Sequence, residues 1–243
     1  MKKIWKYRFY YYLALPGLIY FIIFHYVPMG GALIAFKDIS PFDGLRGFFD
    51  APWVGFKHFE RFTSSVYFLD VIENTLIISG LKILFGFPAP IILALLLNEV
   101  LRMSLKRIMQ TISYLPHFIS WVVTAGMITA LLATSGGLLT ETINDFTGSN
   151  INFLGNKDYF VGILVTSHVW KTIGWSSIIY LAAMSSIDPA LYESARIDGA
   201  NRLQMAWHIT LPSIMFVIVI MFLLEDRKST RLNSSHLVIS YAV

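Results

Sequence analysis

The residues best suited to recognition chemistry lie in one polar stretch, YESARIDGANRLQMAWHITLP, at residues 192–212. Glu193, Arg196 and Asp198 place charges of both signs close together, and Gly199 follows them directly. Charged groups at the rim of an interface mainly guide encounter and specificity. A glycine lets another backbone approach closely. The stretch therefore combines charged and small residues without a set suited to making or breaking bonds.

Residue sets for catalysis are absent from the sequence. It has no GxxxxGK[ST] phosphate loop, no GxSxG nucleophile turn and no Cys. Its six His lack the spacing of a metal site. We therefore expect a chain that is not an enzyme, binds no cofactor or metal, and cannot hydrolyse ATP alone.

The composition indicates a membrane protein. Of the 243 residues, 56% are hydrophobic and 14% are charged, whereas about a quarter of the residues in soluble proteins are charged. The mean hydropathy is +0.61. The net charge of +4 fits basic cytoplasmic loops. We expect no nucleic-acid partner, because no long basic run with interleaved aromatic residues occurs.

Four apolar stretches are long enough to cross about 30 Å of hydrocarbon, and a fifth has only 12 residues. The four predicted spans lie at about 10–36, 71–97, 112–132 and 160–184, and the fifth, partial stretch lies at 213–224. We interpret the first as a retained span, because its apolar part is too long for a signal peptide and no cleavage pattern follows it.

Loop charges predict the orientation of these spans. Four basic residues and no acid precede the first span, and the 98–109 loop has three basic residues against Glu99. The positive-inside rule places both segments in the cytoplasm. The loops at 37–70 and 133–159 are then external, and the polar segment 188–212 is cytoplasmic.

Several residues inside the predicted spans are unusual for a membrane helix. Pro88 and Pro90 in the second span and Pro116 in the third predict kinks. Such a kink can lie beside a translocation path or serve packing alone, and the sequence leaves both open. We interpret Lys82 and Glu73 as charges that snorkel to the outer interface.

The polar segment carries the signals of two short helices. Asp188 predicts an N-cap with Pro189 at the first helical position. Gly199 suits the left-handed position after that helix. Asn201 predicts a second N-cap, and Gln204 completes a capping box. We expect two helices joined at Gly199 on the cytoplasmic face.

The spacing within this segment resembles a known family signature. The residues that match are Glu193-Ser194-Ala195, Gly199, Ile209 and Leu211-Pro212. This pattern is similar to the EAA loop, EAA-x3-G-x9-I-x-LP, of the membrane subunits of bacterial ATP-binding-cassette (ABC) importers, and Ser194 in place of the middle Ala is the one departure. The resemblance implies that the first helix, with Arg196 and Asp198, is a coupling helix that docks into a cleft on a separate ATPase subunit.

The resemblance extends over about residues 5–224, through stretches such as LALPGLIYFIIFHYVPMGGALIAFKD and QTISYLPHFISWVV. They look like the carbohydrate-importer permeases associated with oligosaccharides, such as aldouronate permeases of Gram-positive bacteria. The implied fold is all-α, a polytopic transmembrane helical bundle of the type I ABC importer permease kind, with residues 1–224 as its transmembrane domain.

The resemblance also implies partners and a location. The expected partners are a second permease subunit, two ATP-binding-cassette ATPase subunits, an extracellular solute-binding lipoprotein, a carbohydrate substrate and membrane lipid. ATP and Mg would be bound by the ATPase subunits and not by this chain. The expected location is the bacterial plasma membrane, with a cytoplasmic N-terminus.

The end of the sequence departs from that family. Consecutive charges begin at Glu225, where a span is expected to continue, and their burial in hydrocarbon would be costly. The string DRKSTRLNSSHLVISYAV resembles translated sequencing-adapter read-through. We therefore expect residues 225–243 to be a non-native tail and the permease to be truncated within its fifth span. A natural shortened variant is the alternative.

Two other functional classes compete with an importer permease. An ion-coupled secondary transporter of a small solute would favour inverted repeats and acidic residues near the membrane midplane. The sequence shows no internal repeat, and spans one, three and four have no Asp or Glu in their middle. A membrane-embedded enzyme would require a nucleophile or metal set, which the sequence lacks.

Overall fold

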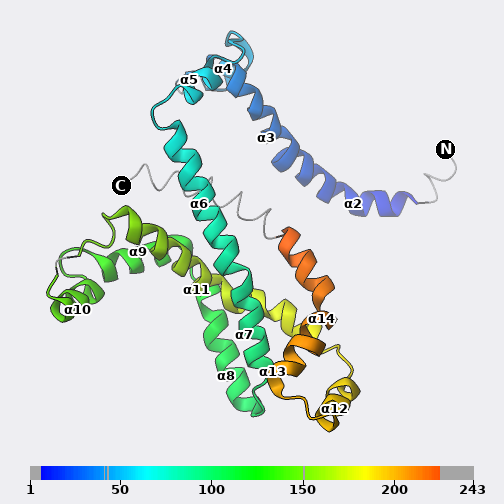
Figure 1. The fold of residues 1–243 in the computed structure, drawn as a ribbon. Coiled ribbons are helices and arrows are strands. Elements are labelled where there is room, and N and C mark those ends of the chain that lie inside the picture. The colour runs from blue at the N-terminus through cyan, green and yellow to red at the C-terminus, as the bar shows by residue number, and fades with distance from the viewer. Residues whose placement is uncertain (1–6, 41, 43, 150, 225–243) are drawn as a thin grey trace. The chain divides into compact units, whose positions relative to one another are not determined.

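The computed structural model describes residues 7–40, 42, 44–149 and 151–224. Within these ranges the regular structure is helical, as the sequence predicts, apart from one isolated antiparallel bridge between Lys37 and Trp53. The chain divides into two compact units, residues 1–72 and 73–243 (Figure 1). The predicted non-native tail, residues 225–243, lies outside the described residues.

The first unit begins with a helical segment that covers the predicted first span. It consists of α2 (Arg8–Phe21), η1 (Ile22–Tyr26), α3 (Val27–Gly30) and η2 (Gly31–Phe36). The segment Ile22–Tyr26 is a π-helical turn, and Pro28 follows it two residues later. Pro28 has no N–H to donate to the carbonyl of Phe24, so the regular α-helical ladder is interrupted there.

A small folded loop follows in the same unit, with α4 (Gly44–Asp50) and α5 (Lys57–Thr63). Lys57 Nζ lies 3.0 Å from Asp38 Oδ2, and His58 Nε2 lies 3.0 Å from the carbonyl oxygen of Lys37. The ring of Phe36 packs against Phe59, with centroids 5.3 Å apart. These contacts join the start of α5 to the end of the first helical segment.

The predicted second span is formed by α6 (Phe68–Gly86) and α7 (Pro88–Asn98). Together they make a 31-residue candidate span, so Pro88 and Pro90 interrupt the helix without bending it sharply. Pro88 is the first residue of α7, where the missing N–H is tolerated. Phe87 N donates to Ile83 O across the junction.

The predicted third span is broken. Helix α8 (Met103–Tyr114) continues into η3 (Leu115–Phe118), and α9 (Trp121–Leu132) leaves at 99° to it. Ile119 and Ser120 are extended, and Ser120 Oγ accepts from Val123 N as the N-cap of α9. The sequence predicted a kink at Pro116, which lies in η3, but the chain turns three residues later.

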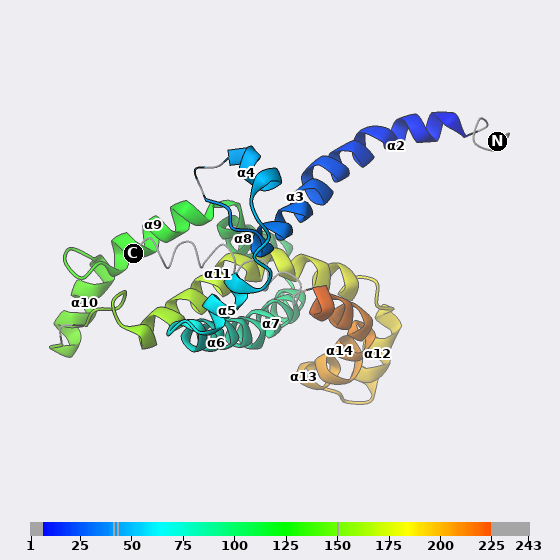
Figure 2. The same ribbon diagram turned by 90° about the horizontal axis from the view of Figure 1, so that it is seen from above.

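The predicted fourth span lies within one long helix. After α10 (Leu138–Thr147), helix α11 (Lys157–Met184) runs for 28 residues. It packs along α7 and α8, and α10 and α12 lie at its opposite ends (Figures 1 and 2).

The core of the second unit forms where α11 meets the C-terminal apolar run. After the segment α12 to α14, the predicted partial span forms a helix at Met215–Leu224. The buried side chains of this core are Ala94, Tyr180, Met184, Ile214 and Met221. The C-terminal helix is therefore packed against both α7 and α11.

By length and apolar composition, two helices of the described residues can cross a membrane: Arg8–Phe36 and Phe68–Asn98. The number rises to four if two bent pairs each count as one span, namely Met103–Phe118 with Trp121–Leu132, and Arg202–Ser213 with Met215–Leu224. Helix α11 has sufficient length but is less apolar, because polar residues such as His168 and Lys171 occupy its middle.

The interpretation of Lys82 as a snorkelling side chain is wrong. Lys82 is only 4% exposed, and its Nζ has no hydrogen-bond partner among the described residues. Lys82 and Gly86 are the buried residues of α6, one helical turn apart, and a Cβ on Gly86 would lie 3.5 Å from the His168 ring. Lys82 therefore lies on the same side of α6 as Gly86, and its side chain is buried. Glu73 is exposed.

Candidate functional site

The first helix of the polar segment forms as its sequence signals predict. Helix α12 spans Pro189–Ile197, with Asp188 as its N-cap and Pro189 at its first position. Asp188 Oδ1 accepts a hydrogen bond of 2.9 Å from Ala190 N. The cap satisfies one backbone donor that the start of the helix leaves unpaired.

The helix ends in a turn that depends on Gly199. Its φ is +81°, and no atom lies within 4 Å of where a Cβ would be. Gly199 is therefore required for its backbone conformation and not for space. Gly199 N donates to Arg196 O at 3.1 Å and Ala200 N donates to Ala195 O at 2.9 Å, the paired bonds of a Schellman motif.

The second helix begins at the predicted capping box and runs to Ser213. Asn201 Oδ1 accepts from Gln204 N at 2.9 Å, and Gln204 Oε1 accepts from Asn201 N at 2.8 Å. The chain then runs through α13 (Arg202–Met205), η4 (Ala206–Thr210) and α14 (Leu211–Ser213). As before Pro28, a π-helical turn precedes Pro212, which cannot donate to the carbonyl of His208.

A hydrogen bond that the sequence analysis missed joins the two helices. Tyr192 Oη lies 2.9 Å from Thr210 Oγ1, and the Thr210 side chain is buried at 3% exposure. Neither residue belongs to the family signature, although Tyr192 directly precedes Glu193 and Thr210 lies between Ile209 and Leu211. No short-range pattern relates residues 18 positions apart, so only the folded segment reveals the pair.

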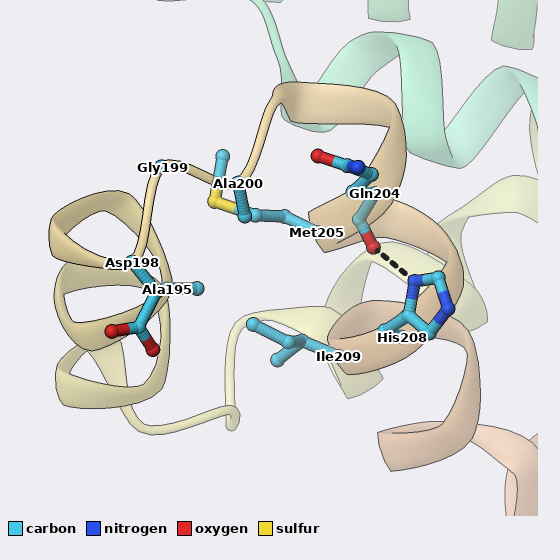
Figure 3. A pocket seen from close by; sticks show the side chains of 8 residues that line it. All are labelled: Ala195, Asp198, Gly199, Ala200, Gln204, Met205, His208 and Ile209. Carbon is cyan, nitrogen blue, oxygen red and sulfur yellow. Dashed lines mark hydrogen bonds between the residues drawn. The ribbon is translucent and has the colours of Figure 1, made fainter.

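The two helices enclose a hollow of about 350 Å³ beside the Gly199 turn (Figure 3). Its lining residues are Ala195, Asp198, Gly199, Ala200, Gln204, Met205, His208 and Ile209. Three residues of the family signature, Ala195, Gly199 and Ile209, thus line this hollow, together with Asp198. Glu193, Ser194 and Arg196 are exposed away from this lining, and Leu211 and Pro212 lie one turn beyond it.

Exposed apolar side chains flank the same turn. Ile197 is 87% exposed and Leu203 is 69% exposed. Large apolar residues that lie exposed together commonly mark a contact with another molecule. The sequence alone gives no signal for either residue, because an apolar residue in a short amphipathic helix is normally expected to face inward.

The segment is tied to the loop between α7 and α8. Arg202 Nη1 lies 3.1 Å from Glu99 Oε2, and both side chains are partly exposed. The two segments consequently lie at the same end of the second unit (Figure 1). The loop charges had predicted the same side of the membrane for both.

Within the described ranges, no three His, Cys, Asp or Glu side chains form a group that could hold a metal ion. The segment offers a hollow, two exposed apolar side chains and charges of both signs around a glycine turn.

This chain belongs to the family of binding-protein-dependent transport system inner membrane components, whose sequence pattern matches residues 86–225. It is 46% identical over 235 residues to the polygalacturonan/rhamnogalacturonan transport system permease protein YteP of Bacillus subtilis (strain 168). That match covers 96% of this chain and 72% of YteP.

Two solved structures also resemble this chain. One is a bacterial ABC transporter involved in the import of the acidic polysaccharide alginate, with a TM-score of 0.82 and 42% identity, covering 92% of this chain and 74% of that chain. The other is a bacterial alginate ABC transporter in complex with an alginate pentasaccharide-bound periplasmic protein, with a TM-score of 0.81 and 42% identity. That match covers 92% of this chain and 73% of the other chain. The predicted resemblance to ABC importer permeases is confirmed, and the family is one of membrane transport components.

Proposed function

We propose that this chain is the permease subunit of an ATP-driven importer of a carbohydrate, more narrowly an oligosaccharide. The observation that carries the proposal is the helix–turn–helix at 188–212, whose signature residues surround a hollow at one end of the second unit. Membership of the transport family and likeness to permeases of acidic polysaccharides support the substrate class.

The segment's proposed role is to dock onto an ATPase subunit. Helix α12 would enter a cleft of that subunit, with Glu193, Arg196 and Asp198 pairing at the rim and Ile197 supplying apolar contact. ATP and Mg would be held by the ATPase subunits, and this chain would hold no cofactor. This chain would contribute mechanical coupling.

The complete importer would contain a second permease, two ATPase subunits and an extracellular solute-binding lipoprotein. The similar alginate transporter was solved with a periplasmic protein that carries the sugar, which supports a binding-protein partner here. The proposed topology places the chain in the bacterial plasma membrane, with the N-terminus and residues 188–212 in the cytoplasm.

Movement of the docked loop would reach the spans through two helices. Helix α11 ends at Met184, a few residues before α12, and the helix at Met215–Leu224 follows α14. Both share the core that contains Tyr180 and Met221. Closure of the ATPase dimer would thereby drive alternating access in a path between the two permeases.

The docking role is tested with a pair of matched glycine variants. Gly199 and Gly148 both follow a helix, have φ of +81° and +65°, and have open space where a Cβ would lie. Because the backbone penalty is similar, Gly199→Trp and Gly148→Trp differ mainly in location. We expect Gly199→Trp to abolish co-purification of the ATPase and sugar uptake, and Gly148→Trp to retain both.

Unchanged association and uptake in Gly199→Trp or Glu193→Arg would contradict the docking role. Uptake of labelled oligosaccharides should stop when ATP is depleted. If uptake instead stopped on collapse of the ion gradient while ATP was maintained, an ion-coupled transporter would be the correct class.

A further inference from the structure

A buried lysine lies at the middle of helix α11. Lys171 is 5% exposed and belongs to α11, between Lys157 and Met184. At 1.5 Å per residue it lies about 20 Å from either end of the helix. In the proposed span, this position is close to the centre of the bilayer, where an isolated charge costs several kcal/mol.

The ammonium group of Lys171 binds the end of the broken span. Its Nζ donates to the carbonyl oxygens of Pro116 at 3.2 Å and His117 at 3.4 Å, and also to that of Ile119. It lies 5.1 Å from the centre of the Trp121 ring. All of these groups belong to η3, to the extended residues after it, or to the first residue of α9.

This contact explains how the break can exist at such a depth. Where α8–η3 ends, carbonyl groups lose their helical partners, and in hydrocarbon no water can replace them. The C-terminal end of a helix also carries partial negative charge. Lys171 supplies three N–H donors and a positive charge. The carbonyl groups at the break thereby gain hydrogen-bond donors, and the buried ammonium group gains acceptors.

Two further contacts fix α11 to the same place. A Cβ on Gly174, one turn after Lys171, would overlap the carbonyl oxygen of Ser113, so the two helices approach each other closely at their backbones. Trp175 stacks on His117 with centroids 4.6 Å apart and ring planes 3° apart. Over residues 171–175, α11 is therefore held against the end of α8–η3.

We propose that Lys171 is a positioning residue that makes the break between η3 and α9 follow the movement of α11. The inference rests on the proposed function. Helix α11 runs without interruption from this junction to the residues before α12, so force on the 188–212 segment reaches Lys171 through one helix. The ammonium group transmits that movement to the broken span by holding its carbonyl groups.

The test compares three variants in the assembled importer reconstituted in lipid vesicles. Lys171→Met removes the positive charge and the N–H donors but keeps an unbranched side chain. Lys171→Arg keeps the positive charge and the N–H donors. Lys157→Met removes an exposed lysine from the start of the same helix. The measurements are ATPase-subunit association, ATP hydrolysis and sugar uptake.

We expect Lys171→Met to retain ATPase association and ATP hydrolysis but to lower the uptake per ATP hydrolysed by about tenfold or more. Lys171→Arg should recover most of that ratio, and Lys157→Met should leave it unchanged. A side chain that serves only stability would lower association, hydrolysis and uptake together. Unchanged uptake per ATP in Lys171→Met would overturn the inference.

A second measurement applies if Lys171→Met does not assemble. In the Cys-free chain, spin labels at Leu115→Cys in η3 and Ile179→Cys in α11 occupy exposed positions. Their separation should be the same with and without an ATP analogue, because the junction moves as one body. A nucleotide-dependent change in this distance would overturn the inference, whereas failure of the unaltered chain to bind any ATPase would overturn the proposed function.

Discussion

Asp188, Gly199 and Asn201 shape the polar segment through their own backbone chemistry. Asp188 and Asn201 accept hydrogen bonds from N–H groups within three residues, and Gly199 adopts a positive φ. Each role involves only neighbouring residues, and each was correctly predicted from the sequence. The docking roles of the signature residues around them remain predictions.

Removal of the second cap should loosen the start of the second helix. Asn201→Ala leaves the Gln204 amide without its acceptor, at a cost of about 1 kcal/mol. Amide hydrogen exchange in residues 202–205 should accelerate about fivefold. Asn201→Asp retains an acceptor and should exchange like the unaltered chain, and equal rates in all three proteins would show that the capping box contributes nothing.

Lys82 and Lys171 show where residue-level reasoning was insufficient. A position at the interface was predicted for Lys82 because a lysine side chain can usually reach water from a helix end. In the structure Lys82 is instead buried, at 4% exposure. Lys171 was not singled out, since the carbonyl groups that it binds lie as many as 55 residues away in the sequence.

At the scale of elements, residues 112–132 are divided among the end of α8, η3 and α9. Pro116 predicted a kink in this span, but the 99° turn comes three residues later and its position was not predicted. The hydropathy pattern contains no information on the contacts that Lys171 and Gly174 of α11 make with this segment. Helix α11, the α6–α7 pair and the first helical segment agree with the predicted spans within a few residues.

The close approach of α11 and α8 can be tested by two glycine substitutions on one helix. Gly174→Ala places a Cβ against Ser113 O and should destabilise the protein by about 1–3 kcal/mol. Gly162→Ala meets nothing within 4 Å and should be neutral or slightly stabilising, because alanine favours a helix. The measurement is the thermal unfolding midpoint in detergent. Equal midpoints for the two variants would exclude a tight contact at Gly174.

At the scale of the whole molecule, the predicted orientation connects the loops to the proposed function. The Arg202–Glu99 ion pair joins two segments that the loop charges placed on one side of the membrane. The relatives are transport permeases, and this chain covers 72% of the length of YteP. The orientation itself stays a prediction.

The absence of Cys makes the orientation directly measurable. Ser194→Cys lies in the 188–212 segment and Ser149→Cys in the loop before α11, and both positions are exposed. A membrane-impermeant maleimide should label Ser149→Cys in intact cells and Ser194→Cys only after permeabilisation. The opposite labelling pattern would reverse the proposed topology.

The sequence by itself determined the all-α class, the membrane character, the helix caps, the Gly199 turn and the family. Long apolar stretches, local hydrogen bonds and a fixed motif spacing are encoded within a few dozen consecutive residues. Only the tertiary structure decided that Lys82 is buried, that Tyr192 bonds to Thr210, and that Lys171 holds the broken span. These features depend on which distant segments meet, because burial and the supply of hydrogen-bond partners are properties of the packed chain.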